Sequence, residues 1–241
     1  MFLILLCAIL CTSSTCVRTH SDNLKKLGQY NLTMPEPSGL AISADGKRLY
    51  MVSDRKGQIY QTDLQGVVQK QIDINGGDYE GIAINQEETI FYLLDENKNK
   101  IECFNTSGDE ICDIDLKTNV SKKSGPEGID LDWTTGEFFI VNESKPTSIS
   151  KFGKDYQLIM SEKSNALSDL SAVTIDPTTK ELWLLSDQDQ KLIRVSPAYD
   201  LIQTYLIDII QMEGLAIDFQ KKIIYIASDS EEELHVFKYS D

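Results

Sequence analysis

The chain has 241 residues, of which 41% are hydrophobic, so it can bury one sizeable core without requiring two domains. Its 38 acidic residues outnumber the 23 basic ones, and a net charge of −15 repels the phosphate backbone of nucleic acids. We therefore exclude nucleic acid as a partner and expect a protein that attracts cations.

The first segment, residues 1–16, is typical of an export leader. Residues 2–11 are almost purely apolar and 12–15 are small and polar, although only Met1 precedes them where a positive charge is usual. About ten apolar residues are too few for a helix that spans a bilayer. We predict an exported protein, with a short linker over residues 17–23.

Cys16 follows the small residues that end this leader, as in a bacterial lipoprotein cleavage site. Ser13 and Thr15 depart from the usual pattern, which has Leu and then Gly or Ala at these positions. Lipidation of Cys16 would anchor the protein to a membrane. The expected location is the bacterial cell envelope, either periplasmic or lipid-anchored, or otherwise the secreted fraction.

The next segment, residues 24–32, alternates apolar and polar residues as a strand does, and it precedes a repeat. The repeats begin with five short segments of similar sequence, which we call openings and which start 42, 47, 44 and 42 residues apart. An acidic residue stands sixteen positions after the first residue of each opening. A repeat of about 40–50 residues made of short strands is the signature of a β-propeller. The pairs are Ser38 with Asp54, Glu80 with Glu96, Glu127 with Glu143, Ser171 with Asp187, and Glu213 with Asp229.

One repeat contains four strands. In the first, these are residues 39–43, 48–53, 58–63 and 67–74, joined by short turns such as Ala44-Asp45-Gly46. The fifth repeat ends one strand short, and residues 24–32 can supply that outer strand and close the ring. The sequence therefore predicts an all-β, five-bladed β-propeller over residues 24–241, with four antiparallel strands per blade and an N-terminal strand in the last blade.

Cys103 and Cys112 lie in the second repeat, on either side of a hairpin turn centred on Ser107 and Gly108. If the hairpin is symmetric, the two cysteines face each other across the strands, close to disulfide distance. An exported protein meets an oxidising compartment. We therefore predict a structural Cys103–Cys112 disulfide.

The acidic pairs predict a metal site at one face of the ring. The first strand of a blade lies nearest the axis, and the end of the antiparallel second strand lies beside its start. Carboxylates gathered in this way raise one another's pKa or require a counter-ion, and Ca²⁺ suits oxygen ligands. The predicted metal ligands are Glu80, Glu127, Glu213, Asp187, Asn142, Glu96 and Glu143.

Two observations limit this prediction. Asp54, Asp187 and Asp229 each precede a turn, where an Asp side chain often bonds to the following backbone instead of a metal. Zinc is disfavoured because the only histidines, His20 and His235, have no cysteine partner at metal-ligand spacing.

Three segments have a pattern that is shared with a known family, namely Asp78–Ala83 with Leu93–Glu96, Leu167–Ser171 with Leu184–Asp187, and Met212–Ala216. The pattern resembles the SdiA-regulated (YjiK-like) calcium-regulated β-propeller family. The resemblance implies an envelope-attached or secreted bacterial propeller that binds calcium centrally, and it leaves the biochemical activity undefined. The chain departs from the pattern at Ala172, which replaces the Gly of the other four openings.

Three functions remain open. The first is a monomeric, non-catalytic calcium-binding protein whose propeller face presents a surface to a small ligand or a protein. The second is a metal-dependent lactonase, esterase or phosphoesterase, because Glu80, Glu127, Asn142, Asp187 and Glu213 could hold an axial cation that polarises a substrate oxygen. The third is an acidic face without metal that binds a basic protein. No catalytic Ser-His-Asp triad or phosphate-binding glycine loop is evident.

Overall fold

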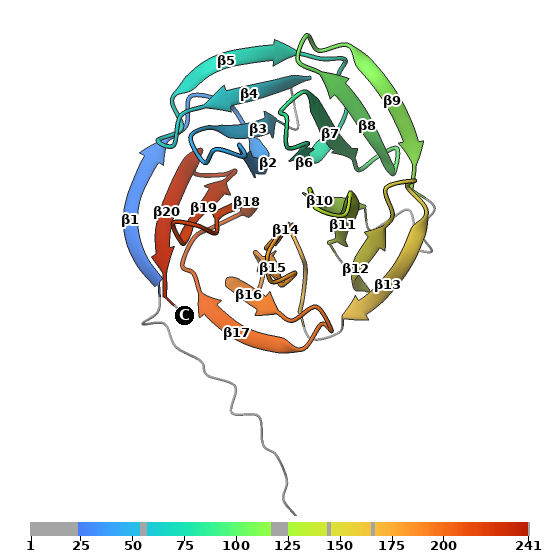
Figure 1. Cartoon of the computed structure of the whole chain (residues 1–241). Coiled ribbons are helices and arrows are strands. Elements are labelled where there is room, and N and C mark those ends of the chain that lie inside the picture. Colours follow the sequence, from blue (N-terminus) through green and yellow to red (C-terminus); the bar gives the residue numbers. More distant parts are fainter. Residues whose placement is uncertain (1–23, 54–56, 117–124, 144–145, 165–166, 241) are drawn as a thin grey trace, which may run out of the picture.

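A computed structural model describes residues 24–53, 57–116, 125–143, 146–164 and 167–240. They form five four-stranded antiparallel sheets, which stand around a common axis like the blades of a propeller (Figure 1). The predicted five-bladed fold is confirmed. None of the described residues belongs to a helix that is long and apolar enough to cross a membrane.

Within each blade, the strands follow one another from the axis to the rim. Blade 1 contains β2 (Pro37–Ile42), β3 (Leu49–Ser53), β4 (Gln58–Thr62) and β5 (Val68–Asp73). Blade 2 contains β6 (Tyr79–Ile84), β7 (Ile90–Asp95), β8 (Lys100–Asn105) and β9 (Glu110–Asp115). Blade 3 contains β10 (Pro126–Asp132), β11 (Glu137–Asn142), β12 (Thr147–Phe152) and β13 (Leu158–Ser164). Blade 4 contains β14 (Ala172–Ile175), β15 (Leu182–Ser186), β16 (Lys191–Val195) and β17 (Leu201–Leu206). Blade 5 contains β18 (Met212–Asp218), β19 (Ile223–Ser228), β20 (Glu233–Tyr239) and, outermost, β1 (Leu24–Asn31).

The N-terminal strand closes the ring, as predicted. β1 runs antiparallel to β20, with Leu24 opposite Tyr239 and Asn31 opposite Glu233 (Figure 1). The first and last strands of the described chain therefore share one sheet, and β1 covers the edge that β20 would otherwise expose. This pairing also places the two ends of the described chain beside each other on the rim.

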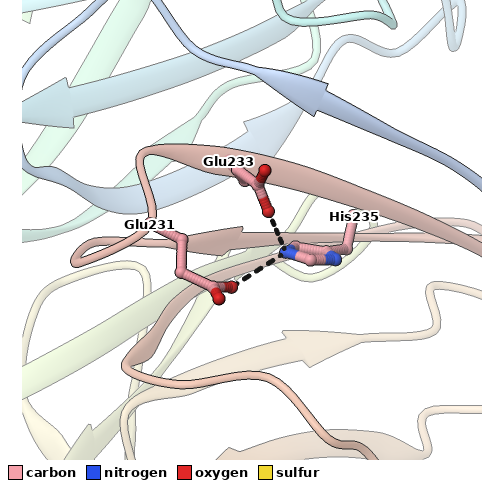
Figure 2. Close-up of side chains that lie close together, drawn as sticks. All are labelled: Glu231, Glu233 and His235. Atoms are coloured by element: carbon pink, nitrogen blue, oxygen red, sulfur yellow. Dashed lines mark ion pairs between the residues drawn. The ribbon is translucent and has the colours of Figure 1, made fainter.

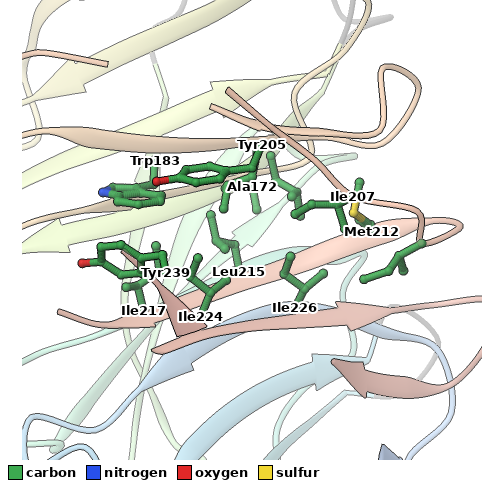
Figure 3. Packing of buried hydrophobic residues seen from close by; sticks show 13 residues of the cluster. Ala172, Trp183, Tyr205, Ile207, Met212, Leu215, Ile217, Ile224, Ile226 and Tyr239 are labelled. Atoms are coloured by element: carbon green, nitrogen blue, oxygen red, sulfur yellow. The ribbon is translucent and has the colours of Figure 1, made fainter. Parts of the chain in front are cut away.

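The hydrophobic core is divided into five clusters, each between two neighbouring blades. Between blades 4 and 5, Trp183 stacks on Tyr205 with ring centroids 5.7 Å apart and meets Tyr239 at 4.7 Å (Figure 3). Alternate residues of each inner strand face opposite neighbours, so both faces of a blade are buried. This explains why the inner strands read as nearly continuous apolar runs.

Cys103 and Cys112 are register partners on β8 and β9, with Cα atoms 4.8 Å apart, and the structure joins them in a disulfide. Cys103 is buried and Cys112 is half-buried on the outer strand. The bond therefore links the two outer strands of blade 2, away from the axis. Cys16 and the leader lie outside the described residues.

Candidate functional site

Three glutamates project from β-bulges at the start of the innermost strands. In blade 2, Tyr79 pairs with Asp95 but Gly81 already pairs with Leu94, so Glu80 is the extra residue of the bulge. The same register shift occurs in blades 3 and 5, where the extra residues are Glu127 and Glu213. A bulge re-aims a side chain without ending the strand, and this one places a carboxylate at the same point of three blades.

The acidic residues sixteen positions later lie beside these bulges. The backbone N–H of Glu96 donates to the carbonyl of Asp78 at 3.0 Å, and that of Asp229 donates to Gln211 at 3.0 Å. The N–H of Glu143 makes the corresponding bond to Gly125 at 3.4 Å. The end of each second strand is therefore tied to the residue before the first strand. This contact accounts for the sixteen-residue spacing.

These side chains line a cavity of about 280 Å³ at one end of the propeller axis. Among the described residues, its lining contains nine carboxylic acids, three uncharged polar residues and no basic residue. The lining residues are Glu36, Ser38, Glu80, Glu96, Glu127, Glu143, Asp169, Ser171, Asp187, Gln188, Glu213 and Asp229. We call this space the acidic cavity.

The acids of the cavity are difficult to ionise together. Burial, with the neighbouring charges of Glu80, Glu96, Glu143 and Glu213, raises the pKa of Glu127 to about 10. Burial and the charge of Glu80, with smaller effects of nearby aspartates, raise the pKa of Glu213 to about 8. Burial followed by the charge of Asp78 also raises the pKa of Glu96. At neutral pH, Glu127 and Glu213 therefore need either protons or a cation.

Glu80 links two blades within this group. The Ser38 hydroxyl donates to the Glu80 carboxylate Oε2 at 2.6 Å and lies 3.0 Å from the Glu80 carbonyl oxygen. One carboxylate oxygen from each of Asp78, Glu80 and Glu96 lies within 4.8 Å of the other two, a separation compatible with one shared ion. Ser38 therefore orients a carboxylate that two further acids approach.

Blade 4 contributes differently. Asp169, which is 3% exposed, accepts the Ser186 hydroxyl at 2.5 Å and the N–H groups of Asp187 and Gln188 at 3.0 and 3.2 Å. Asp187 accepts the N–H of Met212 at 3.0 Å, so one of its oxygens bonds to the first strand of the next blade. The sequence offered backbone bonding as the alternative to metal binding for Asp187. Its side chain does bond to backbone, but to Met212 of the neighbouring blade and not to the turn that follows Asp187.

The structure brings six of the seven predicted ligands together, since Glu80, Glu96, Glu127, Glu143, Asp187 and Glu213 all line the cavity. Asn142 is fully buried outside this lining, and its Oδ1 accepts the Ser148 hydroxyl at 3.3 Å. Asp54 lies outside the described residues.

Two cavity acids were missed by the sequence reasoning, Glu36 and Asp169. Each stands two residues before an opening that carries Ser instead of Glu, namely Ser38 and Ser171. The blades without a bulge glutamate therefore supply their acid two residues earlier. Aligning the openings two residues further upstream would have revealed this substitution.

A second cavity of about 210 Å³ lies at the opposite end of the axis. Its lining includes the apolar side chains of Trp133, Phe219 and Leu215. A space of only about 10 Å³ lies between the two cavities, at the level of Gly81 and Gly128. The two ends of the axis thus differ in chemistry and are separated by a narrow waist.

The acidic cavity can hold a hard divalent cation. It offers many carboxylate and hydroxyl oxygens, and none of its lining residues among those described is His or Cys. Ca²⁺ takes six to eight oxygen ligands in flexible geometry, whereas Zn²⁺ prefers nitrogen and sulfur. The donor set therefore fits Ca²⁺ better than Zn²⁺.

Comparison with known proteins agrees with the architecture. The model of the SdiA-regulated family matches residues 24–236. Among solved structures, the nidogen/laminin complex matches with a TM-score of 0.57 and 15% identity, over 85% of this chain and 80% of the other. Virginiamycin B lyase from Staphylococcus aureus matches with a TM-score of 0.54 and 17% identity, over 88% of this chain and 69% of the other.

Hydrazine synthase from Kuenenia stuttgartiensis is also similar, with a TM-score of 0.54 and 14% identity over 81% of this chain. The chain spans only 56% of that protein's matched chain. At identities this low, these three likenesses show a shared propeller fold and nothing about activity.

Proposed function

The chain belongs to the SdiA-regulated family, and we propose that it is a β-propeller that binds a divalent cation, Ca²⁺, in its acidic cavity. The bound face then presents a surface to a small ligand or a partner protein. The observation that carries this proposal is the convergence of nine carboxylic acids on one cavity without a basic residue among its described lining.

The inner ligands in this proposal are Glu80, Glu127 and Glu213, because their bulges place them at equivalent points of three blades. Glu96 and Glu143 approach the same space from the ends of the second strands. A bound cation would offset the repulsion that otherwise keeps Glu127 and Glu213 protonated. Ca²⁺ binding should therefore release protons and stabilise the folded state.

We further propose that the protein is exported to the bacterial envelope or beyond and acts as a monomer. The disulfide between Cys103 and Cys112 supports this location, since such bonds persist in oxidising compartments. The apolar leader over residues 2–11 supports it independently.

Thermal melts of the chelated protein with added Ca²⁺, Mg²⁺ or Zn²⁺ test the proposal. A ligand at 100 times its Kd stabilises by about 2.7 kcal/mol, which corresponds to about 5–10 °C for a domain of this size. We expect a rise of this order with Ca²⁺ and a smaller one with Mg²⁺. Absence of any shift with all three cations would refute the metal site.

Single substitutions distinguish Ca²⁺ binding in the acidic cavity from a general effect of the protein's negative charge. Glu127→Gln should raise the melting temperature of the metal-free protein, because Gln is neutral without taking up a proton on folding, and should reduce the rise with Ca²⁺. Glu110→Gln, an exposed change on the outer strand β9, is the matched control and should leave both values within about 1 °C. A Ca²⁺ response unchanged in Glu127→Gln would place the ion elsewhere.

A second candidate is metal-dependent hydrolysis of a lactone, ester or phosphate ester at the same site. The observation that favours it is the volume of the acidic cavity, about 280 Å³, which leaves room for a substrate oxygen beside an ion. Turnover of chromogenic esters, lactones and phosphate esters with Ca²⁺ present tests it. Catalysis that Glu127→Gln abolishes would favour the enzyme, and no turnover across the panel would favour binding alone.

A further inference from the structure

A second group of metal-ligating side chains lies at the rim, away from the axis. Glu231, Glu233 and His235 follow one another at every second residue, from the turn before β20 into that strand. Figure 2 shows the two carboxylates directed at the same ring nitrogen of His235. One ligand atom from each of the three lies within 4.8 Å of the others. None of the three lines the acidic cavity.

The spacing suits a four-coordinate metal ion. His235 Nε2 lies 3.3 Å from Glu233 Oε2 and 3.5 Å from Glu231 Oε2 (Figure 2). Zinc bonds to nitrogen and carboxylate oxygen are about 2.0–2.2 Å long, so the edges of a zinc tetrahedron measure roughly 3.3–3.6 Å. Both observed separations fall in this range. They exceed the usual 2.7–3.2 Å of a direct N–H···O hydrogen bond.

The imidazole gives independent support. His235 is 3% exposed, and neither of its ring nitrogens has a hydrogen-bond partner among the described residues. A buried polar group without a partner is unusual in a folded protein, and a missing ion is one of its ordinary explanations. Nε2 is aimed at two carboxylates, which is how a ligand set would be arranged before the ion arrives.

The charges beside His235 suit a cation. Glu231 and Glu233 both direct a carboxylate oxygen at Nε2 of the ring. The two carboxylates can offset the charge of a divalent ion.

The cluster adjoins the strand pair that closes the propeller. Gln29 of β1 is the register partner of His235, and its Nε2 donates to Glu233 Oε2 at 2.5 Å. Hydrogen bonds of this kind orient the ligands of a metal centre. An ion held here would connect the turn before β20 to the strand that carries Gln29, and so strengthen the contact between the two ends of the chain.

We propose that Glu231, Glu233 and His235 bind one divalent transition-metal ion of the zinc type, with solvent completing the coordination. The site is distinct from the acidic cavity in ligand chemistry, because it contains an imidazole, and in location, because it lies at the β1–β20 closure. Glu231, with 39% of its side chain exposed, gives the ion access from solvent.

Calorimetric titration of the full chain with Zn²⁺, in buffer saturated with Ca²⁺ to occupy the axis, tests the proposal. Loss of an outer partner of a metal ligand already costs about 10- to 100-fold in affinity, so Glu231→Gln should weaken Zn²⁺ binding at least about tenfold. Glu232→Gln, the same change at the neighbouring exposed residue, is the matched control and should leave the affinity unchanged. His235→Gln should abolish this binding event.

A Zn²⁺ affinity that is equal in Glu231→Gln and Glu232→Gln would overturn the proposal. Because His235 is buried and its replacement could disturb folding, Glu231→Gln in the exposed turn provides the decisive comparison. Cobalt substitution gives a second readout, since visible absorption of the Co²⁺ protein reports a histidine-containing four-coordinate site. Absence of that absorption in the wild-type protein would equally contradict it.

Discussion

At the scale of single residues, the glycine after each bulge glutamate controls how closely the inner strands approach. A Cβ atom added to Gly128 would lie 2.7 Å from the Cα of Ala172 and 2.9 Å from a methyl group of Val141. A Cβ on Gly81 would lie 2.8 Å from the carbonyl oxygen of Glu127. These contacts are too short for a side chain, so glycine lets neighbouring bulges converge on the axis. The glycine thus allows the close approach that brings the preceding glutamate to the axis.

We expect Gly128→Ala to destabilise the protein by about 1–3 kcal/mol, because the added methyl group meets backbone that cannot yield easily. The substitution should also weaken Ca²⁺ binding by displacing Glu127. Urea denaturation and calcium titration measure the two effects. Gly76→Ala is the control, since a Cβ there meets nothing within 4 Å. A Gly128 variant as stable as the Gly76 variant would show that the close approach of the inner strands does not require glycine at position 128.

At the scale of strands and hairpins, blade 2 differs from its neighbours by the covalent link between β8 and β9. The two cysteines are nine residues apart, so the bond closes a short loop. In the chain-entropy account, a loop of this length contributes about 2–3 kcal/mol by restricting the unfolded chain. The bond lies on the outer half of the blade, and neither cysteine lines the acidic cavity.

Reduction should therefore lower the free energy of unfolding by about 2–3 kcal/mol and leave calcium affinity unchanged. Urea denaturation with and without a phosphine reductant measures the first effect, and calcium titration measures the second. The double variant Cys103→Ala/Cys112→Ala should unfold at the same denaturant concentration in both buffers. A full response to reductant in that variant would mean that the effect does not arise from this bond.

The elements were largely predictable from the sequence, because periodic apolar runs and turn residues are local signals. The strand expected at residues 48–53 is β3, Leu49–Ser53, and the donated strand at 24–32 is β1, Leu24–Asn31. The bulges were not predictable, since a register shift is a property of two paired strands. The approach of Glu231 to His235 depends likewise on the geometry of a turn, so the spacing of histidines and cysteines in the sequence did not indicate it.

At the scale of the whole molecule, the acidic cavity makes stability depend on pH in a known direction. The pKa values of Glu213 and Glu127 rise from the ordinary 4.5 to about 8 and about 10 in the folded state. A group whose pKa is raised by folding contributes its stability fully below its unfolded pKa and loses it as pH rises through the folded value. The metal-free protein should therefore lose stability from about pH 4.5 upward.

We expect the melting temperature of the chelated protein to fall between pH 5 and pH 8, and saturating Ca²⁺ to flatten this fall because the ion replaces the protons. Melts across this pH range, with and without Ca²⁺, measure the effect. Glu213→Gln should make the metal-free curve less steep, while Glu127 still takes up a proton on folding. A metal-free protein that becomes more stable over this range would show that other groups dominate its titration.

The register of blade 5 determines which face the molecule would turn toward a surface that holds it. Met212, Ser228, Glu233 and Asn31 lie in line at the edge that carries the acidic cavity. Leu24 and Tyr239 pair at the other edge. A surface that held the protein next to Leu24 or Tyr239 would therefore face the cavity lined by Trp133, Phe219 and Leu215. The acidic cavity would open on the opposite face, toward solvent.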